Sequence, residues 1–132
     1  MKKKEKFKEG IKFDSGKERF DLMPARPLFY LAKVYTFGAK KYEDRNWEKG
    51  MKWGKIFGAI QRHLWKFWMG EDLDDETGLP HLAHAAWGCL TLLEYYHTHS
   101  QLDDRTFNKS NFERFLNEIT QISTRKYKEK SK

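Results

Sequence analysis

The chain has 132 residues, enough for one domain with a real hydrophobic core and too few for two. Its formal net charge of +7 comes from the termini: residues 1–12 carry six Lys against two Glu, residues 125–132 carry five basic groups against one Glu, and the rest sums to −1. A nucleic-acid-binding protein should carry its basic stripe on the folded surface, so nucleic-acid binding is disfavoured as the main function. No apolar run approaches the roughly 18 residues of a membrane span, and no membrane partner is expected.

The first part of the chain predicts a tail, an arm and one helix. Residues 1–10 are lysine-rich and are expected to form a disordered basic tail. Residues 11–22 alternate apolar and polar side chains around a turn signal at 14–17, which predicts a small hairpin or an extended arm. Apolar side chains at helical spacing then predict a helix over residues 28–41, and residues 42–53 are typical of a loop.

Three further helices are predicted after this loop. They run from about 55 to 69, from 80 to 98 and from 110 to 126, and a basic tail follows at 127–132. Four helices that each carry one apolar face predict an all-α fold, a four-helix bundle built from a single domain over residues 11–126.

The predicted helix over residues 80–98 carries two distinct faces. Its apolar stripe, expected to enter the core, comprises Leu82, Ala86, Cys89, Leu90 and Leu93. Its second face, expected to be a pocket wall, comprises His81, His84, Gly88, Thr91 and Tyr95. Cys89 is the only cysteine, which excludes an intramolecular disulfide and fits a reducing cytosol.

An acidic loop precedes that helix. Five carboxylates fall within six residues: Glu71, Asp72, Asp74, Asp75 and Glu76. Carboxylates this close repel one another, which is tolerated in open water or around a cation. A solvated loop and simple capping of the next helix are the alternatives, but capping does not require the imidazoles of His81 and His84 one turn later. Oxygen-rich ligation favours Mg²⁺ or Mn²⁺, and direct ligation by the histidines would favour Mn²⁺.

Two neighbouring residues of the helix over 55–69 are further candidates. His63 projects into the middle of the apolar face, where a histidine is either a hydrogen-bonded core residue or a catalytic one. Arg62 lies off that face and is placed to pair with a loop carboxylate or to reach a phosphate.

A basic and aromatic group precedes the same helix: Lys40, Lys41, Tyr42, Asn46 and Trp47. Aromatic rings stack on bases, an amide reads a base edge, and lysines hold phosphates as point charges. A surface loop with a partly buried Trp47 is the alternative. Lys17, beside the turn at 14–17, is a weaker candidate for a phosphate contact.

The segments FGAKKYEDRNW and AIQRHLWKFWMGEDLDDETGLPHLAHAAW resemble the phage and bacterial dATP/dGTP diphosphohydrolases, the MazZ-like relatives of the all-α MazG-type nucleoside triphosphate pyrophosphohydrolases. The resemblance covers about residues 11–97 and leaves the last predicted helix and both tails outside. Its motifs occur in order at Gly16-Lys17, Phe37-Gly38, Lys41-Tyr42, Asn46-Trp47, Arg62-His63, Gly70-Glu71, Asp74, Glu76-Thr77-Gly78, His81 and His84.

This resemblance implies hydrolysis of a purine deoxynucleoside triphosphate to the monophosphate and pyrophosphate, with Mg²⁺ or Mn²⁺ as cofactor. The metal ligands would be Glu71, Asp74, Glu76 and His81. The catalytic residues would be Glu71, Glu76 and His63. The substrate-binding residues would be Lys17, Lys40, Lys41, Tyr42, Asn46, Trp47, Arg62 and His84.

One departure from the wider MazG group concerns the metal site. That group binds metal through an E-x-x-E on one helix and an E-x-x-D on the next. Glu71-x-x-Asp74 can serve as the second element, but residues 62–69 contain no E-x-x-E. His81 and His84 are the candidates to substitute for it.

Two other functions stay open from the sequence. The same pocket is compatible with a non-catalytic protein that sequesters a nucleotide or a nucleotide-derived signal, and the basic tails are compatible with a helical nucleic-acid-binding or scaffold protein. A homo-oligomer, dimer or tetramer, is expected because four short helices bury this much aromatic surface more completely across a symmetric interface. The expected location is the cytoplasm, that of the host if a phage encodes the chain.

Overall fold

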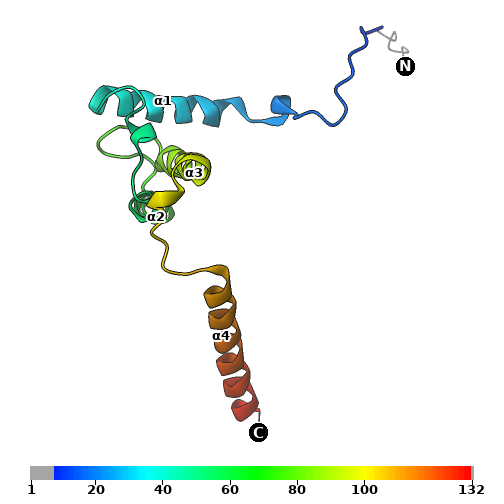
Figure 1. The fold of residues 1–132 in the computed structure, drawn as a ribbon, viewed down its shortest axis with the longest axis vertical. Coiled ribbons are helices and arrows are strands. Elements are labelled where there is room, and N and C mark those ends of the chain that lie inside the picture. Colours follow the sequence, from blue (N-terminus) through cyan, green and yellow to red (C-terminus); the bar gives the residue numbers. More distant parts are fainter. Residues whose placement is uncertain (1–7, 132) are drawn as a thin grey trace.

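The computed structural model describes residues 8–131 of the chain and is shown in Figure 1. It contains four α-helices: α1 (Ala25–Lys41), α2 (Trp53–Trp68), α3 (His81–Thr98) and α4 (Lys109–Lys130). It also contains three short 3₁₀ segments: η1 (Phe20–Leu22), η2 (Asn46–Lys49) and η3 (Ser100–Leu102). No strand forms within residues 8–131, so the predicted all-α fold is confirmed. No helix in this part of the chain is both long and apolar enough to cross a membrane.

The N-terminal segment is an extended arm that leads into α1 (Figure 1). A turn in it closes where the N–H of Lys17 donates to the carbonyl of Asp14 at 3.0 Å, with Gly16 in the positive-φ region at 78°. Of the two predicted alternatives for residues 11–22, the arm is therefore found and the hairpin is not. Of the predicted tail, residues 1–7 lie outside the described part of the chain.

The core forms where α2 packs against α3, the most extensive contact between helices, and α1 packs on the same helix α3. Its buried members are Trp53, Ile56, Ile60, Ala85 and Tyr95. Gly88 sets how closely the two helices approach, because a Cβ added there would lie 2.3 Å from Cγ1 of Ile60. No side chain can occupy that space without displacing Ile60.

The prediction of which face of α3 enters the core was wrong. Leu82, Leu90 and Leu93 of the predicted stripe are exposed, as are Ala86 and Cys89. Four of the six buried residues belong instead to the face predicted as a pocket wall: His81, Gly88, Thr91 and Tyr95. This face is buried because Gly88 leaves room for the side chain of Ile60. Its polar groups also have hydrogen-bond partners, since the Tyr95 hydroxyl donates to the carbonyl of Trp47.

Helix α4 does not join the other three, so the predicted four-helix packing is replaced by a three-helix unit with α4 standing apart (Figure 1). Its N-terminus is capped by Asn108, whose side chain accepts from the N–H of Asn111 at 2.9 Å. It continues to Lys130, through most of the predicted basic tail. Its apolar face is exposed and comprises Phe112, Phe115, Leu116, Ile119 and Ile122.

The substitution Gly88→Ala tests the close contact of α2 and α3. We expect it to lower the free energy of unfolding by about 1–3 kcal/mol, because the added methyl group must displace Ile60. Gly38→Ala is the matched control: Gly38 also lies in a helix, but nothing lies within 4 Å of an added Cβ, so alanine should stabilise by about 0.5–1 kcal/mol. Urea unfolding followed by circular dichroism measures both. Equal stability of Gly88→Ala and the unmodified chain would contradict the contact.

Candidate active site

The acidic loop between α2 and α3 is folded back on itself by backbone hydrogen bonds. The N–H of Asp74 donates to the carbonyl of Leu79 at 2.9 Å, and the N–H of Gly78 donates to the carbonyl of Asp74 at 2.8 Å. Gly70 and Gly78 adopt the positive φ angles of 101° and 68° that the bends require. The run of carboxylates is therefore a closed turn in which neighbouring side chains point in different directions.

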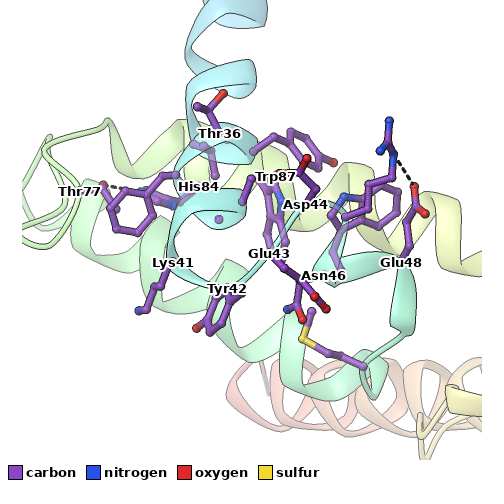
Figure 2. Close-up of a pocket in the computed structure, with 18 of the residues that line it drawn as sticks. Thr36, Lys41, Tyr42, Glu43, Asp44, Asn46, Glu48, Thr77, His84 and Trp87 are labelled. Atoms are coloured by element: carbon purple, nitrogen blue, oxygen red, sulfur yellow. Dashed lines mark hydrogen bonds and ion pairs between the residues drawn. The ribbon is translucent and has the colours of Figure 1, made fainter.

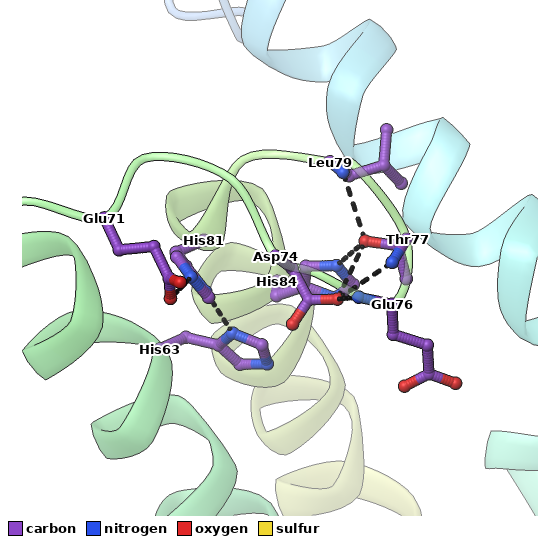
Figure 3. Close-up of polar contacts among 8 residues, drawn as sticks. All are labelled: His63, Glu71, Asp74, Glu76, Thr77, Leu79, His81 and His84. Carbon is purple, nitrogen blue, oxygen red and sulfur yellow. Dashed lines mark hydrogen bonds and ion pairs between the residues drawn. The ribbon is translucent and has the colours of Figure 1, made fainter.

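Asp74 is the carboxylate that this turn directs inward. Its Oδ1 accepts hydrogen bonds from the N–H groups of Glu76 and Thr77 at 3.1 and 3.0 Å, and the Thr77 hydroxyl lies 3.2 Å away. Its other oxygen faces the side of His63 (Figure 3). Glu76 points outward and pairs with Nζ of Lys41 on α1 at 2.5 Å.

Three histidines from α2 and α3 meet under this loop (Figure 3). Nδ1 of His63 lies 2.9 Å from Nδ1 of His81, and Nε2 of His81 lies 2.7 Å from Oε2 of Glu71. The ring of His84 stacks on that of His63 with 4.6 Å between centroids, and its Nε2 lies 2.7 Å from the hydroxyl of Thr77. His81 is fully buried, whereas His63 and His84 are partly buried.

The surroundings keep these groups in forms that can hold a cation. Burial, followed by the neighbouring imidazoles of His84 and His81, lowers the pKa of His63 to about 4. Burial also lowers the pKa of His84. For Asp74, burial raises the pKa, but the hydrogen bonds from Thr77 and the nearby imidazoles of His84 and His63 together outweigh it and bring the pKa below its ordinary value. Near neutral pH, His63 therefore offers a neutral imidazole and Asp74 an ionised carboxylate.

One group of side chains has the geometry of a metal site. A nitrogen of His63, a nitrogen of His81 and a carboxylate oxygen of Asp74 all lie within 4.8 Å of one another. Of the four ligands predicted from the sequence, this group contains Asp74 and His81. Glu71 instead contacts the far nitrogen of His81, and Glu76 pairs with Lys41.

A cavity of about 820 Å³ extends from this cluster along α1 and the loop after it (Figure 2). Its size is within the roughly 300–1,000 Å³ typical of small-molecule sites. In Figure 2, His84 and Thr77 lie at one side, Asn46 and Glu48 at the other, and Trp87 between them. Eight residues predicted from the sequence line it: Lys41, Tyr42, Asn46, Trp47, His63, Asp74, Glu76 and His84.

The other predicted site residues do not line this cavity. Glu71 and His81 contact each other but are not among the lining residues. Lys17 lies in the N-terminal arm, and Lys40 and Arg62 are exposed on α1 and α2. Of the predicted residues, the structure therefore gathers one lysine, the loop amide and the rings around the cavity, and leaves three of the expected phosphate ligands outside it.

Three of the lining residues that the sequence did not single out as site residues have identifiable roles in the cavity. Tyr35 and Trp87 contribute its aromatic wall: the ring of Tyr35 lies 5.9 Å from that of Trp47 and 6.2 Å from that of Trp87. Thr77 connects Asp74 to His84 through its hydroxyl. In the sequence, helical spacing identifies Tyr35 only as an apolar position of a helix. Thr77 stands out only as a member of the motif Glu76-Thr77-Gly78.

The sequence model of the family described as dATP/dGTP diphosphohydrolase, N-terminal, matches residues 8–105. A dATP/dGTP diphosphohydrolase of Salmonella phage PMBT28 is 37% identical over 99 residues, which cover 75% of this chain and 34% of that protein. The chain thus spans about a third of the length of this curated relative. No solved structure matches the chain.

These matches confirm the resemblance found in the sequence, and they cover nearly the same part of the chain. Helices α1, α2 and α3, the acidic loop and the cavity all lie within the matched residues, whereas α4 lies beyond them. The chain belongs to the dATP/dGTP diphosphohydrolase family and corresponds to its N-terminal region.

Proposed function

We propose that this domain hydrolyses a purine deoxynucleoside triphosphate to the monophosphate and pyrophosphate with the help of a divalent cation. The observation that carries the proposal is the convergence on one cavity of eight residues chosen from the sequence motifs. The name of the phage relative, dATP/dGTP diphosphohydrolase, supports the choice of substrate.

The two sides of the cavity suit the two ends of such a substrate. The rings of Trp47 and Trp87 and the amide of Asn46 offer stacking and hydrogen bonding to a purine base. On the other side, Lys41 offers a cation to the phosphates, and Asp74 lies within reach of the same space. The base would therefore occupy the side near η2, with the triphosphate directed toward the histidines.

In the reaction, a water oxygen attacks the α-phosphorus, the bond from that phosphorus to the α–β bridging oxygen breaks, and pyrophosphate leaves. A divalent cation, Mg²⁺ or Mn²⁺, would supply neutralisation of the phosphates and activation of the water. Glu76 stands at the rim of the cavity and is the carboxylate that we assign to orienting this water. Its partner Lys41 is exposed and can exchange Glu76 for a phosphate oxygen, since surface ion pairs contribute little stability.

Incubation of the protein with each of the dNTPs and NTPs, in Mg²⁺ or Mn²⁺, tests the proposal. Chromatography should show monophosphate and pyrophosphate from a purine deoxynucleotide in amounts that exceed the enzyme many times. Inorganic triphosphate with a nucleoside, or diphosphate with orthophosphate, would contradict attack at the α-phosphorus.

The substitution Glu76→Gln tests the assigned carboxylate. We expect kcat to fall by roughly 100-fold or more, since a positioned acid–base group contributes about that much, while circular dichroism reports an unchanged helical content. Asp75→Asn is the matched control, because Asp75 is the exposed neighbour in the same loop and does not line the cavity. Equal turnover by Glu76→Gln and Asp75→Asn would remove Glu76 from the mechanism.

A nucleotide-sequestering protein is the second candidate, and the absence of an E-x-x-E on α2 favours it. Such a protein would bind a purine nucleotide in the same cavity and release it unchanged. Its signature is a nucleotide that travels with the protein through gel filtration at one equivalent, with no product after hours of incubation. Multiple turnover excludes it.

We also propose that the chain forms a homo-oligomer through the exposed apolar stripe of α3 and the apolar face of α4. Leu90 and Leu93 of α3 are 46% and 62% exposed, and no other helix covers α4 within the described chain. An amphipathic helix is stabilised mainly by packing its apolar face. A second copy of the chain offers an apolar α3 stripe and an apolar α4 face against which the same surfaces of the first copy can pack. Exposed apolar area of this extent is typical of an interface.

The substitution Leu90→Asp tests the oligomer. A buried carboxylate at the centre of the stripe should shift the protein from oligomer to monomer, measured by sedimentation velocity across a range of concentrations. Leu22→Asp introduces the same charge at an exposed leucine of η1 and should leave the mass unchanged. A monomeric unmodified chain at every concentration would contradict the proposal.

A further inference from the structure

The contact between His63 and His81 brings two ring nitrogens close together. Their Nδ1 atoms face each other at 2.9 Å, and the rings are tilted by 43°. The contact lies against the acidic turn, where a carboxylate oxygen of Asp74 completes a group of three ligand atoms within 4.8 Å. Two helices and one loop therefore direct two nitrogens and one oxygen at the same small volume.

The nitrogen–nitrogen distance suits two ligands of one metal ion as well as a hydrogen bond. A divalent transition metal binds imidazole nitrogen at about 2.1 Å. Two such nitrogens at adjacent corners of an octahedron, about 90° apart at the metal, are then about 3 Å from each other. The observed 2.9 Å agrees with this spacing.

Glu71 fixes which nitrogen of His81 is available. Its Oε2 lies 2.7 Å from Nε2 of His81, and an ionised carboxylate can only accept a hydrogen bond. The proton of a neutral His81 therefore sits on Nε2, and Nδ1 carries the lone pair. A carboxylate on the far nitrogen of a histidine is the usual support of a metal-bound imidazole.

The geometry points to a transition-metal centre held by Nδ1 of His63, Nδ1 of His81 and a carboxylate oxygen of Asp74, with Glu71 as the residue that positions His81. Two nitrogens and one oxygen favour Mn²⁺, Fe²⁺, Co²⁺ or Zn²⁺ over Mg²⁺, which prefers oxygen ligands. His63 and Asp74 line the cavity, and His81 is buried behind them. The open coordination positions of the cation therefore face the cavity.

This inference rests on the proposed function only for the reaction that the cation serves. The proposed ligands differ from those expected from the sequence, because Glu71 contacts His81 and not the cation, and Glu76 forms an ion pair with Lys41. The alternative is a plain hydrogen bond in which His63 donates from Nδ1 to His81. That alternative requires no cation and gives Asp74 no part in the contact.

Binding of Co²⁺ to the chelator-treated, full-length chain is the first test. The visible absorption of Co²⁺ reports nitrogen ligation, and a titration gives an apparent Kd in the absence of any nucleotide. We expect one equivalent of Co²⁺ to bind, Mn²⁺ and Zn²⁺ to displace it, and Mg²⁺ at the same concentration to fail. Displacement by Mg²⁺ as readily as by Mn²⁺ would overturn the nitrogen-rich site.

Variants identify the ligands in the same titration. His63→Gln should weaken Co²⁺ binding by more than the roughly 10–100-fold that the loss of an outer partner causes, and Glu71→Ala should weaken it within that range. His97→Gln is the matched control, since His97 is exposed on α3 and lies outside the cluster. His63 is only partly buried, so circular dichroism should show that its variant folds. Unchanged Co²⁺ affinity in His63→Gln would overturn the proposal.

Nitrogen NMR of the imidazoles resolves which atoms ligate. Addition of Zn²⁺ should shift Nδ1 of both His63 and His81, leave Nε2 of His81 protonated, and leave His97 unchanged. Histidine signals that do not respond to Zn²⁺ would establish the plain hydrogen bond instead.

The two proposals fail in distinguishable ways. If the chain binds Co²⁺ through His63 but hydrolyses no nucleotide, the metal centre is supported and the proposed function is contradicted. If the chain hydrolyses nucleotides with Mg²⁺ and its histidines respond to no cation, the proposed function is supported and the metal centre is contradicted.

Discussion

The spacing between α2 and α3 is the constraint on which the rest of the structure depends. Ile60 occupies the space that a side chain at position 88 would take, so the two helices lie as close as a glycine allows. His63 is one turn beyond Ile60, and His81 and His84 lie two and one turns before Gly88. The close approach therefore brings His63 within hydrogen-bond distance of His81 and in stacking contact with His84. A wider spacing would separate the imidazoles and leave no shared volume for a ligand.

The acidic turn divides its carboxylates by direction. Backbone N–H groups hold one oxygen of Asp74 and leave the other toward the histidines, whereas Glu76 reaches across to Lys41 of α1. Glu71 supports His81 from the far side. Three of the five carboxylates thus have different partners, which reduces the mutual repulsion that makes a run of carboxylates costly. Counting acidic residues in the sequence could not separate these roles.

Periodicity in the sequence predicted all four helices to within a few residues, and the order of motifs led to the right family. It failed where burial depends on what a helix packs against. The leucines of α3 form the more apolar stripe, yet the face with Gly88 and Thr91 is buried because small and hydrogen-bonded side chains let α1 and α2 come close. It also missed Trp87, because an aromatic residue on a helix is usually a core residue and only the path of α1 makes it a cavity wall.

The ion pair between Lys41 and Glu76 connects the C-terminal end of α1 with the acidic turn at the edge of the cavity. Both side chains are about half exposed, so the pair is screened by solvent and its loss costs the fold little. A triphosphate that enters the cavity carries several negative charges and competes for Lys41 directly. In the proposed reaction, binding of the phosphates to Lys41 would therefore free the Glu76 carboxylate. The same lysine would hold Glu76 in an ion pair in the free protein and release it when a substrate binds.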